Sequence, residues 1–134
     1  KAFYECDNFI TINLPDSVTT IEAWAFRDCD SLTSVNIPDS VTTIGEEAFS
    51  CCDSLKSVTI GNSVTSIGNY AFYDCDSLKY VYCKATTPPA LGGSDVFDFN
   101  ASGRRIIVPI GSGEAYRKAT YWKVYANVIF EDEF

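Results

Sequence analysis

The sequence predicts an α/β repeat solenoid, a coil of similar units stacked on one another and closed by a different C-terminal segment. Two observations predict this fold: one pattern recurs every 23 residues, and each unit contains a short run of alternating apolar residues. Hydrophobic residues make up 46% of the chain and charged residues 21%, as in ordinary globular proteins, so we expect a packed core. With 134 residues the chain has the size of one domain, and we expect residues 1–134 to form a single one.

The repeat is visible in four kinds of position that keep the same offset. Units with such an unbroken period cannot bury their apolar face alone and stack on one another. We expect a partial repeat at about residues 1–24, repeats at 25–47 and 48–70, and a fourth at 71–83 that leads into a C-terminal cap at 84–134. The recurring positions are Ala2, Ala25, Ala48 and Ala71, each followed by Phe; Cys6, Cys29, Cys52 and Cys75; Asp7, Asp30, Asp53 and Asp76; and Phe9, Leu32, Leu55 and Leu78.

Each unit contains the spacing of a leucine-rich repeat. In Leu32-x-x-Val35-x-Ile37 the last part alternates with period two and predicts a short parallel strand. Pro38 then marks a turn, because proline cannot donate to a strand ladder. The sequence therefore predicts a leucine-rich-repeat solenoid, a right-handed superhelix with a short parallel β-sheet on one face and short helical turns opposite. The helical turns are predicted from apolar residues three or four apart, namely Ile44, Ala48, Phe49, Cys52 and Leu55.

The pattern breaks after Tyr82, where a loop rich in Thr, Pro and Gly begins. The segment Ile106–Pro109 then restores a strand in the register of Val35, Ile37 and Pro38. Ser112 is predicted to cap a following helix, with Glu114 in its first turn. The apolar side of that helix would carry Ala115, Tyr116, Ala119 and Trp122.

The six cysteines favour a packing role over a chemical one. Cys6, Cys29, Cys52 and Cys75 occupy equivalent inward positions, and we predict buried free thiols, because free cysteine packs as a small hydrophobe. An inter-repeat disulfide and a metal site are the alternatives, although parallel side chains make the disulfide dihedral hard to reach. Cys83 takes the place of Ile37 and should also lie in the core. Cys51 replaces an acidic residue of the other copies and should be the exposed thiol.

Composition disfavours catalysis and nucleic-acid binding. The chain has no His, which removes the commonest general base, and it has no phosphate-binding glycine loop. We therefore expect no enzyme, no catalytic residue, no cofactor and no metal. The acidic columns at Asp7, Asp30, Asp53 and Asp76, and also Asp16 and Asp39, indicate turn caps, with calcium as the alternative. The formal net charge of −8 repels nucleic acid and anionic membranes, and no apolar stretch is long enough for membrane insertion.

Strand alternation predicts which side chains face solvent on the sheet. If Val35 and Ile37 point inward, Ser34 and Asn36 point outward, and the period extends them into two rows. The rows change from small polar residues to aromatic and cationic ones toward the cap, and Tyr and Arg supply much of the energy of protein interfaces. Covering the exposed edge of the core is the alternative role. The first row is Thr11, Ser34, Ser57, Tyr80 and, through the cap strand, Arg105; the second is Asn13, Asn36, Thr59, Tyr82 and, through the same strand, Ile107. The candidate ligand-binding residues are Ser34, Asn36, Ser57, Thr59, Tyr80, Tyr82 and Arg105.

The repeat unit resembles the BspA-like leucine-rich-repeat family of bacterial surface proteins. The likeness rests on Ala-Phe-x-x-Cys-Asp-Ser-Leu-x-x-Val-x-Ile-Pro-x-Ser-Val-x-x-Ile-Gly at residues 25–45. Val108–Ser112 with Tyr116 and Trp122 is similar to the closing segment of such proteins from gut and oral anaerobes.

The resemblance implies a cell-surface or secreted, adhesin-like module, with an extracellular or host protein or a polysaccharide as partner. A structural spacer or accessory region of a larger surface protein is the alternative. Residue 1 falls inside a repeat, so we expect any export signal to lie upstream and expect self-association through the uncapped N-terminal repeat.

Overall fold

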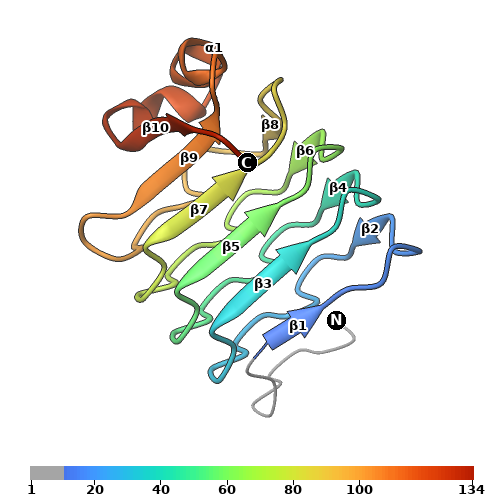
Figure 1. The fold of residues 1–134 in the computed structure, drawn as a ribbon. Helices are drawn as coiled ribbons and strands as arrows, with labels where there is room; N and C mark the ends of the chain where they lie inside the picture. The colour runs from blue at the N-terminus through green and yellow to red at the C-terminus, as the bar shows by residue number, and fades with distance from the viewer. Residues whose placement is uncertain (1–10) are drawn as a thin grey trace.

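The protein is a solenoid in which each coil adds one strand to each of two parallel sheets (Figure 1). The computed structural model describes residues 11–134. The predicted α/β repeat solenoid is confirmed, with the coils stacked from β1 at one end to the helices of the cap at the other. Predictions for Phe3, Cys6, Asp7 and the open end of the first repeat lie outside the described residues.

The larger sheet is entirely parallel and has the order β1-β3-β5-β7-β9-β10. Its register places equivalent residues of successive repeats opposite one another, as Val35 is paired with Val58 and Val81 with Ile106. The predicted cap strand therefore continues the sheet in the expected register. The strands are β1 (Thr11–Asn13), β3 (Ser34–Ile37), β5 (Ser57–Ile60), β7 (Tyr80–Cys83), β9 (Arg105–Pro109) and β10 (Ile129–Asp132).

A second, smaller sheet runs along the solenoid, and the sequence pattern did not predict it. Each of its strands has two residues, too few for a period-two alternation to be recognised. A glycine follows β4, and a Cβ there, at Gly45, would overlap the backbone nitrogen of Ala23 in the preceding coil. This close approach explains the recurring Ile-Gly pair. The strands are β2 (Thr20–Ile21), β4 (Thr43–Ile44), β6 (Ser66–Ile67) and β8 (Ala90–Leu91).

The predicted helical turns are wrong, because this part of each repeat forms consecutive non-helical turns. The N–H groups of Phe49 and Cys51 donate to the carbonyls of Ala71 and Tyr73 in the next coil, at 2.7 and 2.8 Å. These groups are therefore not available for the i−4 bonds of a helix. Glu47 and Cys51 also have left-handed φ values of 56° and 61°, which interrupt a right-handed helix.

A ladder of phenylalanine rings joins the coils in the core. Phe26, Phe49, Phe72 and Phe97 stack in nearly parallel planes with centroid distances of 5.1, 5.3 and 5.6 Å. Trp122 of the cap contacts the last ring at 5.6 Å. Each coil therefore contributes one ring to the interface with its neighbours, and contacts between neighbouring coils are what stabilise a repeat array.

Beside this ladder runs the cysteine column, and the prediction of buried free thiols is confirmed for Cys52, Cys75 and Cys83. The thiols of Cys52 and Cys75 donate to the carbonyl oxygens of Phe26 and Phe49, each at 3.1 Å. Cys29 is buried in the same column, and burial raises the pKa of the Cys83 thiol to about 12.

Asn100 takes the place of the cysteine in the coil that follows Cys75. Its amide Nδ2 donates to the Phe72 carbonyl oxygen at 2.8 Å, the equivalent acceptor in that coil. A thiol and an amide thus do the same work of satisfying a buried carbonyl group. Phe97 and Asn100 stand 25 residues after Phe72 and Cys75, so a two-residue insertion hides this coil from the 23-residue period.

The cap contains α1 (Gly113–Lys118) and the 3₁₀ helix η1 (Trp122–Val128). Glu114 lies in the first turn of α1 as predicted, but the helix ends earlier than predicted because Ala119 is extended. The prediction that the Ser112 side chain caps α1 is wrong. Ser112 makes no capping hydrogen bond, and the carboxylate of Glu131 on β10 accepts the N–H of Gly113 at 2.8 Å instead.

Three aromatic side chains hold the chain between β7 and β9 against the helices of the cap. The Tyr116 hydroxyl donates to the Ala85 carbonyl at 2.6 Å, and the Trp122 indole N–H donates to the Pro89 carbonyl at 2.7 Å. The Tyr125 hydroxyl donates to Ser94 at 2.6 Å. Buried tyrosine and tryptophan thus find partners for their polar atoms while their rings close the end of the core.

Candidate functional site

The solvent side of the larger sheet carries the two predicted rows of side chains. The strand register aligns Ser34 with Ser57 and Tyr80 with Arg105, and it aligns Thr59 with Tyr82 and Ile107. All the candidate residues therefore share one face and are exposed or half-buried there. They are Ser34, Asn36, Ser57, Thr59, Tyr80, Tyr82 and Arg105.

Toward the cap this face becomes aromatic. The rings of Tyr80 and Tyr82 lie 6.2 Å apart and nearly parallel, and Tyr80 is 39% exposed. Phe130 on β10 is paired with Ile107 and extends the second row by one strand. The guanidinium of Arg105 lies 4.9 Å from the centre of the Phe130 ring, within the range of a cation–π contact.

Phe134 adds a further ring to this face. It lies edge-on to Tyr82 at 6.4 Å and is 57% exposed, and the C-terminal end of the described chain lies beside β7 (Figure 1). Sequence reasoning missed both phenylalanines. The apolar stretch 128–130 was a signal for a further strand that contains Phe130, whereas the sequence contains no signal for Phe134. Tyr80, Tyr82, Phe130, Phe134 and Arg105 together are called the aromatic face below.

A groove of about 610 Å³ adjoins the aromatic face where the strands of the larger sheet end. It combines an ammonium group, an amide and two carboxylates with the ring of Phe134. Lys84 also forms a salt bridge with Asp39 at 3.6 Å, on the side of a neighbouring hollow that includes Asn36. This strand-end groove is lined by Asn62, Lys84, Thr86, Pro109, Ile110, Asp132, Glu133 and Phe134.

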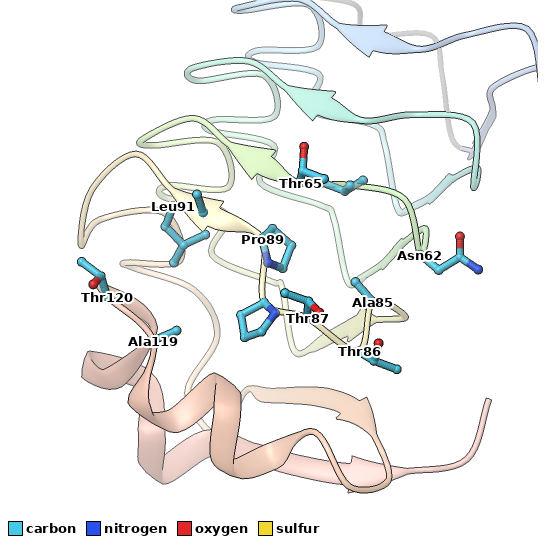
Figure 2. A pocket seen from close by; sticks show the side chains of 12 residues that line it. Asn62, Thr65, Ala85, Thr86, Thr87, Pro89, Leu91, Ala119 and Thr120 are labelled. Carbon is cyan, nitrogen blue, oxygen red and sulfur yellow. The ribbon is translucent and has the colours of Figure 1, made fainter.

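Figure 2 shows a different groove, of about 520 Å³, between the loop after β7 and the end of α1. None of the predicted site residues lines it. Its polar groups are threonine hydroxyls and one amide, and no lining residue is ionisable. The groove therefore offers neither a general acid nor a general base. Its lining residues are Asn62, Val64, Thr65, residues 85–91, Ala119 and Thr120.

The acidic columns do not act as the predicted turn caps at Asp30, Asp53 and Asp76, since no hydrogen bond within residues 11–134 joins these carboxylates to the backbone. Asp39 does accept a backbone N–H, that of Asn62 in the next repeat, at 2.8 Å. Partial burial and the neighbouring charges of Asp30 and Asp76 raise the pKa of Asp53. Within the described residues no group of three or more Asp, Glu, His or Cys side chains is placed to hold a metal ion.

Comparison with known proteins agrees with the repeat geometry. A family model described as a BspA type leucine rich repeat region matches residues 1–107 in six copies. The chain belongs to the BspA-type leucine-rich repeat family. This confirms the resemblance seen in the 23-residue unit, and the match runs into β9.

One solved structure similar to this BspA-type chain is that of a leucine rich cell surface protein from Faecalibacterium prausnitzii A2-165. The two chains are 25% identical and superpose with a TM-score of 0.50. The alignment covers 94% of this chain and 36% of the other, so this chain spans about a third of that protein's length. No curated protein shows significant similarity to this chain.

Proposed function

We propose that this BspA-type chain is a non-catalytic binding module, displayed on a bacterial cell surface or secreted, whose aromatic face contacts an extracellular protein or a polysaccharide. The concentration of exposed rings at one end of the sheet carries the proposal. Toward β1 the outward positions hold Ser, Thr and Asn, whereas four rings and an arginine gather beside the cap. Exposed apolar groups clustered in this way mark interaction sites.

Two observations support the surface location. The similar protein from Faecalibacterium prausnitzii is a cell surface protein, and the family is that of BspA-type repeats. Among the described residues, no helix is long and apolar enough to cross a membrane.

The residues of the grooves support a non-catalytic role. The chain has no His, and the groove of Figure 2 contains no ionisable residue. In the strand-end groove, Asp132 accepts the backbone N–H of Glu133 at 2.8 Å, which occupies one carboxylate in a local turn. In this proposal both grooves contribute shape and hydrogen bonds to binding.

The chemistry of the aromatic face suits a ligand with both apolar and polar surface. Ring faces pack against the C–H side of a sugar or against apolar side chains, and Arg105 offers a cation for an acidic group. The strand-end groove next to Phe134 adds the Lys84 ammonium group and the Asn62 amide as hydrogen-bond donors. A ligand that spans both surfaces gains apolar and polar contacts together.

The experiment is a binding screen against purified extracellular-matrix proteins and defined polysaccharides. The test variant combines Tyr80→Ser with Tyr82→Thr, which installs the residues of the preceding repeat at these two positions. The control is Ser34→Ala on the same face. We expect the wild type to bind at least one member of the panel, the double variant to lose at least about tenfold in affinity, and the control to bind normally.

Two results would overturn the proposal. Absence of binding by the wild type to every member of the panel would favour a structural spacer. Unchanged affinity of the folded double variant would show that Tyr80 and Tyr82 only cover the core. Thermal unfolding of each variant verifies that a lost affinity is not a lost fold.

A further inference from the structure

A second group of aromatic side chains lies on the turns between the two sheets. The rings of Tyr70 and Tyr73 are 5.0 Å apart and nearly perpendicular, and Phe99 lies edge-on to Tyr73 at 5.4 Å. Phe99 is 65% exposed, the most exposed of the large hydrophobic side chains in residues 11–134. The three rings belong to adjacent coils and none of them belongs to the aromatic face.

Phe99 does not fit the pattern of the position it occupies. The hydrogen bond from the Asp74 N–H to the Asp98 carbonyl, at 2.9 Å, places Phe99 one coil beyond Asp74. Equivalent positions in earlier coils are Asp28 and Cys51, and all of them have left-handed φ values between 57° and 62°. Aspartate tolerates this conformation, whereas a bulky residue is strained there. The ring at position 99 contacts Tyr73 but is mostly exposed, so its backbone conformation does not explain it; Tyr70 of the same group also has a left-handed φ, of 62°. Strain of this kind is concentrated at functional sites.

Three carboxylates accompany the rings. Asp74 occupies the position equivalent to Phe99 in the preceding coil, and Asp98 is the residue before Phe99 in sequence. The negative charge of Asp95 is the largest cause that raises the pKa of Tyr70. Within the described residues these three carboxylates take part in no salt bridge. The positive charge of Arg104 favours the ionised form of Asp98, but the Arg104 guanidinium lies over the Tyr125 ring, 5.1 Å from the ring centre.

We propose that Tyr70, Tyr73 and Phe99, together with Asp74, Asp95 and Asp98, form a second docking surface, the turn ridge, for an arginine-bearing basic segment of a protein partner. A guanidinium stacks on an aromatic ring and at the same time donates to carboxylates, which a lysine ammonium does less well. The net charge of −8 also attracts a basic partner. On the aromatic face, by contrast, Arg105 already covers the Phe130 ring and repels a further cation.

Phe99→Asn is the decisive variant, because it removes the ring and leaves the charge unchanged. Asparagine adopts the left-handed conformation readily, so the midpoint of urea unfolding should be unchanged or higher. The probes are fluorescent peptides of alternating glycine with arginine, lysine or glutamate, and binding is measured by anisotropy at physiological ionic strength. The wild type should bind the arginine peptide more tightly than the lysine peptide, and Phe99→Asn should weaken arginine binding by at least about fivefold.

A matched control removes a ring from the aromatic face. Phe130→Asn should leave the affinity for the arginine peptide unchanged, which also separates this proposal from the proposed function. Undiminished binding by Phe99→Asn would reduce the effect to general attraction by an acidic chain and overturn the proposal. A lower unfolding midpoint for Phe99→Asn would assign the ring a structural role and overturn it too. So would dimerisation of the wild type that Phe99→Asn abolishes, since the ridge would then join two copies of this chain.

Discussion

Replacing Phe49 by alanine removes a central ring from the ladder that joins the coils. The ring is fully buried and stacks on Phe26 at 5.1 Å and on Phe72 at 5.3 Å. A buried Phe→Ala change costs about 3–5 kcal/mol, including the cavity that it leaves. Each stacked pair accounts for about 0.5–1.5 kcal/mol, so Phe49→Leu, which loses both pairs but keeps most of the apolar volume, should cost about 1–3 kcal/mol.

Urea unfolding of the wild type and both variants measures these differences. Far-UV circular dichroism reports the sheets, and fluorescence includes Trp122, which contacts the far end of the ladder at Phe97. Because domains are stable by only about 5–15 kcal/mol, Phe49→Ala should lower the unfolding midpoint strongly with both probes. A loss below about 1 kcal/mol for Phe49→Leu would refute the view that ring stacking joins the coils, because leucine keeps most of the apolar volume and loses only the stacked pairs.

The remaining predictions concern single positions. In the native protein a maleimide should label the half-buried Cys51 before the fully buried Cys52. The thiolate is the reactive form, and burial raises the pKa of the Cys51 thiol, so its labelling rate should keep rising toward alkaline pH. Equal labelling of both cysteines in peptide maps would contradict this. Partial burial and nearby carboxylates raise the pKa of Asp53, so its ionisation destabilises the fold as pH rises through that pKa. Asp53→Asn should therefore raise the midpoint of urea unfolding at pH 7 and have no such effect near pH 3. An equal gain at the two pH values would count against charge repulsion at Asp53. Gly61→Ala should destabilise more than Gly103→Ala. A Cβ at Gly61 lies 2.5 Å from a backbone carbonyl oxygen, whereas one at Gly103 meets open space and costs only the strain of its left-handed φ of 77°; similar urea midpoints would argue against the clash.

The 23-residue period was sufficient to predict the repeat architecture and the content of the sheet face. A position that faces inward in one coil faces inward in every coil, so the rows as far as Tyr80 and Tyr82 follow from the spacing of Val35 and Ile37. Arg105 and Ile107 join these rows at an offset of 25 residues, and they could be placed only because the cap strand matches the apolar pattern of the repeat strands. The cysteine column could be predicted for the same reason. Apolar periodicity records burial, and burial repeats along a solenoid.

Hydrogen-bond partners could not be predicted in this way. Apolar residues three or four apart fit a helix and a series of turns equally well, and only the bonds from Phe49 and Cys51 to the next coil decide for turns. The cap of α1 likewise depends on Glu131, which lies 18 residues beyond the N–H group of Gly113 that it accepts.

The features most relevant to binding also depend on the tertiary structure. Phe134 joins the aromatic face only because β10 pairs with β9 and carries the chain back toward Tyr82. The equivalence of Phe99 to Asp74 is visible only in the structure, because two extra residues in its coil hide it from the 23-residue period. The sequence pattern thus describes which side chains are buried within each coil. Contacts between segments far apart in the chain decide which rings gather at the surface.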